Sequence, residues 1–145
     1  MFLPIVAFLL AVAADEPAWR IEITTTGGFT GHGSGALTVD ADGSLTTRPG
    51  CRLRLTAADL KTLGELVAKS KPQEWKPSYV QPANPHGCCD MIGTTLTLTR
   101  GNSRWTSSWF DDHLPLPQDL DAIVSAVWAP APTTIRARYK AQCQP

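Results

Sequence analysis

The stretch GTTLTLTRGNSRWTSSWFD, residues 93–111, alternates apolar and polar side chains on both sides of a Gly-Asn pair. Leu96 and Leu98 share a face of the first half, and Trp105 and Trp109 share a face of the second. Alternation with a period of two is typical of a half-buried strand, and a Gly-Asn pair between two such runs is typical of a hairpin turn. The stretch therefore predicts two antiparallel strands with one face in the core.

Three earlier segments alternate in the same way: AWRIEITTT (18–26), ALTVDADGSLTT (36–47) and CRLRL (51–55). The first and third predict single strands, and the second predicts another hairpin. The DADG sequence in that hairpin, residues 40–43, resembles the opening of a calcium loop. Its glycine comes too early for the full calcium-binding pattern, so we expect a turn.

Two segments instead have the periodicity of amphipathic helices. In TAADLKTLGELVAKSKP (56–72), Thr56 is the expected N-cap, with Asp59 three residues later. Gly64 weakens the middle of this helix. The second segment, PQDLDAIVSAVWAP (117–130), begins at a proline and ends at a proline. We expect helices over about 56–71 and 117–129.

These elements predict an α+β fold in which both helices cover one face of a mostly antiparallel β-sheet. The other face is expected to be rich in threonine and serine and at least partly wet. Residues 72–92 contain four prolines and predict a long irregular loop. Residues 130–145 predict a proline-punctuated, basic tail.

The N-terminal residues indicate where the protein is located, and its charge limits which partners it can have. Residues 2–12 form an apolar run that is too short to span a bilayer, and Ala11-Val12-Ala13 fits a signal-peptidase site. A buried N-terminal strand or helix is the alternative. Lysine plus arginine and aspartate plus glutamate each number 13, which argues against nucleic acid and anionic membranes as partners. We expect a signal peptide over 1–13 and an exported monomeric domain over 14–145, without a membrane anchor.

The chain has four cysteines: Cys51, Cys88, Cys89 and Cys143. In an exported chain they predict disulfides. Adjacent Cα atoms lie about 3.8 Å apart, whereas ordinary disulfides need about 4.4 to 6.8 Å between Cα atoms. Cys88 and Cys89 are therefore expected to bond to other cysteines, one bridge joining the long loop to the sheet and the other joining it to the tail. The sequence leaves open which cysteine takes which partner.

Two alternatives use the segment NPHGCCDMIG, residues 84–93, differently. Zinc would be held by His86, Cys88, Cys89 and Cys143, although zinc ligands are usually separated by two or more residues. A cysteine nucleophile would take His86 as its base, but nothing nearby would lower the thiol pKa. We favour disulfides over both.

Further candidate sites each have an ordinary structural alternative. Asp111, Asp112 and His113 suggest a metal or acid–base site, or else an acidic loop before a helix. Trp105 and Trp109 suggest a binding platform, or else core packing. Phosphate-binding, serine-hydrolase and zinc-peptidase motifs are missing from the sequence, so we expect neither an enzyme nor a cofactor.

Several blocks of the sequence together resemble a known protein family. They are RIEITTTGGFTG, the helix LTAADLKTLGELVAKS, and TTLTLTRGNSRWTSSWFDD followed by LPQDLDAIVSAV. In this order they resemble the emfourin-type protein inhibitors of thermolysin-like metallopeptidases. GGFTG, residues 27–31, is the most specific part. The chain departs from the family in its leader, the DADG hairpin, the cysteines and the HGCCD loop.

The resemblance implies a protein inhibitor whose partner is a metallopeptidase. Its candidate contact residues are Gly27, Gly28, Phe29, Gly31 and His32. Phe29 either enters a partner's cleft or anchors a bulged strand in the core, and the residues leave both open. Rival functions are a surface interaction module that uses the threonine- and tryptophan-rich sheet face, and a zinc or redox protein that uses His86, Cys88 and Cys89.

Overall fold

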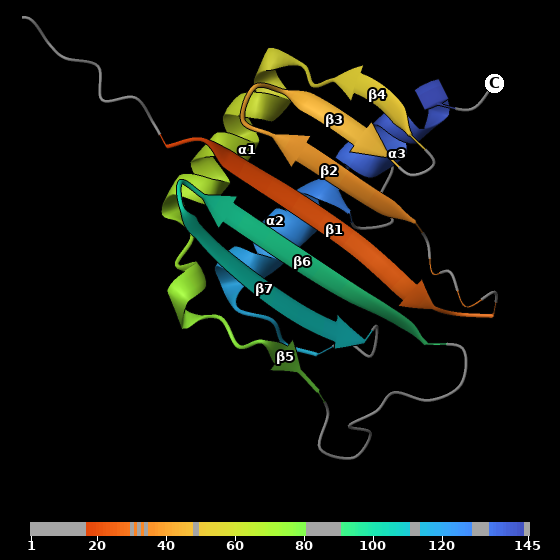
Figure 1. Cartoon of the computed structure of the whole chain (residues 1–145), viewed down its shortest axis with the longest axis vertical. Helices are drawn as coiled ribbons and strands as arrows, with labels where there is room; N and C mark the ends of the chain where they lie inside the picture. Colours follow the sequence, from red (N-terminus) through yellow and green to blue (C-terminus); the bar gives the residue numbers. More distant parts are fainter. Residues whose placement is uncertain are drawn as a thin grey trace, which may run out of the picture.

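The central strand β1 (Trp19–Gly27) pairs with a neighbour on each side, so its alternating side chains organise the sheet. A computed structural model describes residues 17–29, 31, 33, 35–47, 50–80, 91–110, 114–128 and 134–143. Seven strands form one sheet in the order β4-β3-β2-β1-β6-β7-β5 (Figure 1). All pairs are antiparallel except the pair between β5 and β7.

The hairpin predicted over residues 93–111 is confirmed. It consists of β6 (Ile92–Arg100) and β7 (Ser103–Phe110). Leu98 lies opposite Trp105, so the leucine face and the tryptophan face are the same face of the sheet. Trp109 is buried, and Trp105 packs against the core. The tryptophans thus belong to the helix-covered face, and the prediction of a tryptophan-rich open face is wrong.

The second hairpin and the strand after it are also confirmed. β2 (Ala36–Asp40) and β3 (Ser44–Thr47) are joined by a turn in which the Gly43 N–H donates to the Asp40 carbonyl at 2.9 Å. Gly43 has a positive φ, as this tight turn requires. β4 (Cys51–Arg54) pairs with β3 and forms one edge of the sheet.

Helix α1 (Ala57–Lys69) begins at the expected cap. Thr56 Oγ1 accepts a hydrogen bond from the Asp59 N–H at 3.2 Å. The reciprocal half of a capping box does not form, because the Thr56 N–H donates to Tyr139 Oη at 2.9 Å. The helix ends at Lys69, before Pro72.

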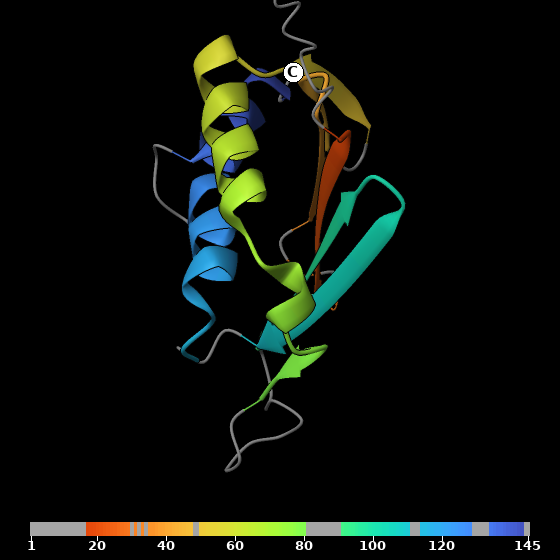
Figure 2. The same ribbon diagram turned by 90° about the vertical axis from the view of Figure 1, so that its left-hand side faces the viewer.

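Helix α2 (Gln118–Val127) lies beside α1 on the same face of the sheet (Figure 2). The core fills the space between these helices and the sheet. Its fully buried members are Ile21, Ile23, Leu37, Val39, Leu45, Leu63, Val67, Leu96, Leu98, Leu120, Ile123 and Val127. The α+β arrangement predicted from the sequence is therefore confirmed.

Two segments that were expected to be irregular contain short elements. After α1 come a 3-10 turn η1 (Pro72–Glu74) and the edge strand β5 (Ser78–Tyr79), which runs parallel to β7. Near the C-terminus, α3 (Ile135–Lys140) and η2 (Ala141–Cys143) form part of the expected tail. α3 folds because Ile135 and Tyr139 are buried in the core. No local sequence pattern predicts this contact.

Candidate functional site

The candidate site is the glycine-rich loop that follows β1, and its shape is fixed by its own backbone. The Gly27 N–H donates to the Gly31 carbonyl at 3.3 Å, and the Gly31 N–H donates to the Gly28 carbonyl at 3.0 Å. The Gly33 N–H then returns to the Gly27 carbonyl at 2.8 Å. These bonds close a tight loop with Phe29 at its tip.

Two of the glycines are required by close backbone approach. A Cβ atom on Gly27 would lie 2.6 Å from the Met91 carbonyl oxygen, and one on Gly33 would lie 2.6 Å from Thr25. Both glycines also have φ values, +80° and +65°, that L residues rarely adopt. The Gly28 N–H donates to the Met91 carbonyl at 3.1 Å, which anchors the loop to the chain just before β6.

Phe29 is the most exposed large apolar side chain in the described part of the chain, at 92% of its full accessible area. The alternative in which Phe29 anchors the core is therefore wrong. Gly27, Gly28 and Gly31 hold its backbone, while His32 lies outside the described residues.

Other apolar side chains lie at the same end of the sheet. Ile92 is opposite Gly27 in the pairing of β1 with β6, and Phe110 is opposite Gly93 in the pairing of β6 with β7. Val80 follows β5 and is 42% exposed. Figure 1 shows the ends of β1, β5 and β7 and the start of β6 gathered at this end. The sequence did not single out Val80 or Phe110, because only strand order brings them together.

This end of the sheet is uncharged over its described strand ends, residues 24–29, 78–80, 91–95 and 107–110. The carboxyl groups whose pKa values are shifted lie elsewhere. Partial burial raises the pKa of Asp119, but hydrogen bonds from the Lys71 N–H, Trp75 Nε1 and the Leu120 N–H outweigh it, so the net pKa lies below the usual range. Asp119 thus joins α2 to the segment after α1, a structural role.

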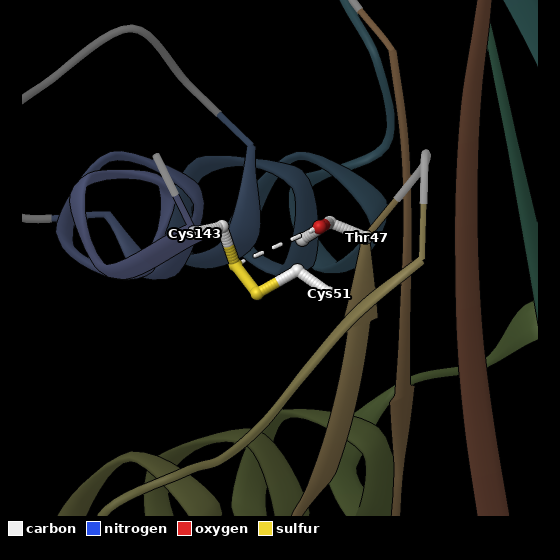
Figure 3. Close-up of a disulfide and its surroundings, with 3 residues drawn as sticks. All are labelled: Thr47, Cys51 and Cys143. Carbon is white, nitrogen blue, oxygen red and sulfur yellow. Dashed lines mark hydrogen bonds between the residues drawn. A yellow bond between two sulfur atoms is a disulfide. The ribbon is translucent and has the colours of Figure 1, made fainter. Parts of the chain in front are cut away.

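The cysteine pairing differs from the expected one. Cys51 of β4 is bonded to Cys143 of η2, with Cα atoms 5.7 Å apart (Figure 3). Thr47, opposite Cys51 in the sheet, directs its hydroxyl at Cys143 Sγ at 3.8 Å. The expectation that both of these cysteines bond to the long loop is wrong, because α3 returns the end of the chain to β3 and β4.

The remaining predicted sites fall outside the described residues. These are the leader (1–13), His86, Cys88, Cys89, Asp111, Asp112 and His113. Within the described ranges, no three metal-ligating side chains form a group that could hold an ion. In the same ranges, none of the helices is long and apolar enough to cross a bilayer.

Comparisons with protein-family models, with curated proteins and with solved structures return no match to this chain. The candidate site therefore rests on its geometry and on the resemblance carried by its residues.

Proposed function

We propose that this protein is an exported protein-binding domain that inhibits a thermolysin-like metallopeptidase by inserting Phe29 into an apolar pocket of the enzyme. One observation carries the proposal: Phe29 is 92% exposed at the tip of a loop that is closed by its own hydrogen bonds. Burying an aromatic side chain in a partner's pocket is a common source of binding energy at protein interfaces.

The loop is suited to binding because it is already ordered. Its backbone bonds run within residues 27–33 and from Gly28 to Met91, so little conformational freedom remains to be lost on docking. Preorganisation of this kind strengthens binding without adding contacts. Val80, which follows β5 and is 42% exposed, and the partly exposed Phe110 of β7 lie at the same end of the sheet.

The enzyme class comes from the family resemblance. GGFTG, residues 27–31, is both the most specific part of that resemblance and the segment that presents Phe29. This coincidence supports inhibition of a metallopeptidase over binding to an unrelated protein.

The test is a titration of a thermolysin-like peptidase with the mature protein and with its Phe29→Ala variant. We expect the wild-type protein to inhibit, and Phe29→Ala to weaken inhibition by about 30-fold or more, which corresponds to about 2 kcal/mol. Phe29→Ala should change the free energy of unfolding by less than about 0.5 kcal/mol, because the side chain is exposed. Unchanged proteolysis at a large molar excess of the wild-type protein would rule out inhibition.

A second candidate is a surface interaction module that uses the helix-free face of the sheet. Hydroxyl side chains line this face across neighbouring strands, including those of Thr38 and the exposed Thr106, whose hydroxyl lies 2.9 Å from that of the buried Thr97. Thr106→Ala tests this face, since Thr106 is exposed and lies four residues along β7 from Phe110. Its free energy of unfolding is measured alongside, because the change removes the hydroxyl partner of the buried Thr97. Loss of partner binding in Thr106→Ala but not in Phe29→Ala would favour this second function.

A further inference from the structure

A groove lies at the other end of β1, where α1 crosses the first residue of the strand. It has a volume of about 520 Å³, within the range of about 300 to 1,000 Å³ typical of ligand sites. Trp19, Ala41, Leu60 and Ala68 give it apolar walls. Gly64 also lines the groove, and we call the space that its missing side chain leaves open the notch. Lys61, Glu65 and Lys69 stand at its rim.

The groove contains a buried donor that has no acceptor among the residues that the structure describes. Trp19 is only 8% exposed, and among the described residues its indole Nε1–H makes no hydrogen bond. This nitrogen would lie 4.0 Å from a Cβ atom built on Gly64, so it faces the notch. Leaving a buried donor without a hydrogen bond costs free energy. A ligand that supplies an acceptor for this N–H would therefore gain binding energy.

Gly64 is not explained by packing. It lies inside α1, where glycine weakens a helix relative to alanine. A Cβ atom there would meet only Trp19 Nε1 at 4.0 Å, an ordinary contact distance, so alanine would fit. What glycine provides at this position is open space directly in front of the indole N–H.

We infer that this groove binds a short peptide segment with an apolar side chain. A backbone carbonyl oxygen of the peptide enters the notch at Gly64 and accepts the hydrogen bond from Trp19 Nε1. The apolar side chain lies against Ala41, Leu60 and Ala68. The single buried donor is neutral and the rim carries both signs of charge, so the groove favours a neutral amide over a carboxylate.

The inference is tested by titrating the ¹⁵N-labelled mature protein with N-acetyl-L-leucine amide and following the indole N–H signals. The Trp19 signal is identified by its absence in Trp19→Phe. We expect this signal alone among the indoles to shift downfield, as it does on gaining an acceptor. N-acetylglycine amide, which lacks the apolar side chain, should shift it much less at the same concentration.

Gly64→Ala separates binding from folding. Its methyl group fills the notch, so we expect at least tenfold weaker binding together with a higher melting temperature. Thr62→Ala is the matched control, because Thr62 lies on α1 outside the groove and alanine again favours the helix. This control should raise the melting temperature and leave binding unchanged. An unmoved Trp19 signal, or wild-type affinity in Gly64→Ala, would overturn the inference.

Discussion

Asp59 shows how one residue can join distant parts of the chain. Its carboxylate accepts hydrogen bonds from Arg138 at 2.6 Å, from Tyr139 at 3.0 Å and from Thr56 at 2.9 Å. Partial burial raises the pKa of this carboxyl, but the three donors outweigh that effect and bring the net pKa below its usual value. Because the pKa is lower in the folded protein, the ionised carboxylate stabilises the fold above about pH 4. That contribution is lost as the pH falls through the folded-state pKa.

The first prediction concerns Asp59→Asn. At pH 7 we expect it to lower the free energy of unfolding by about 1.5 to 3 kcal/mol, the range for hydrogen bonds to charged groups. The difference from wild type should narrow as the pH falls below about 4, where the wild-type carboxylate also becomes protonated. Urea unfolding at a series of pH values measures both effects.

Glu65→Gln is the control for Asp59→Asn, because Glu65 is an exposed acidic residue on the same helix. We expect no measurable loss of stability from it. A deficit in Asp59→Asn that is as large at pH 3 as at pH 7 would show that ionisation of Asp59 is not what stabilises the fold.

At the scale of elements, the sequence predicted the strands and helices whose apolar residues repeat at a regular spacing. The alternating segments became β1 to β4, β6 and β7, and the two amphipathic segments became α1 and α2. β5 has only 2 residues and α3 only 6, too few to show a period. α3 is stabilised by tertiary contacts, through Tyr139, Arg138 and the bridge at Cys143.

The candidate site was predictable only where it depends on local sequence. GGFTG marked the loop, because three glycines within five residues indicate backbone angles that other residues resist. Whether Phe29 faces the core or solvent depends on the bond from Gly28 to Met91, 63 positions apart in the chain (91 minus 28). The pairing of Cys51 with Cys143 spans 92 residues and was equally hidden.

The bridge and α3 together lead to the next prediction. Cross-linking residues this far apart in sequence restricts the unfolded chain, which typically stabilises the fold by about 2 to 4 kcal/mol. We expect the double variant Cys51→Ser/Cys143→Ser to have a free energy of unfolding lower by about 2 to 4 kcal/mol. α3 should be the first element of this variant to unfold. Faster amide exchange over residues 135–143, with β1 and β6 still protected, is the measurement.

The control for the double serine variant is the wild-type protein under reducing conditions, which should unfold at the same urea concentration as the variant if the bridge accounts for the change. A non-reducing peptide map of the wild type should link the peptide containing Cys51 to the one containing Cys143. Finding Cys51 linked to Cys88 or Cys89 instead would contradict this arrangement.

On the scale of the whole molecule, β1 has a candidate binding site at each end, the groove at Trp19 and the loop that carries Phe29. It is 9 residues long, and at about 3.3 Å per residue Trp19 and Gly27 lie about 26 Å apart along the strand. β1 is paired with β6 along its full length, so neither end can move without disturbing the core. A ligand in the groove at Trp19 and a protein held at Phe29 would therefore neither touch each other nor compete.

The last prediction follows from this separation. Adding N-acetyl-L-leucine amide at a saturating concentration should leave the inhibition constant for the peptidase unchanged within about twofold, because sites that far apart with no shared side chain behave additively. Gly64→Ala should inhibit as the wild type does, and Phe29→Ala should retain the Trp19 indole shift. If the amide instead displaced the peptidase, the enzyme would have to contact the α1 end of the sheet.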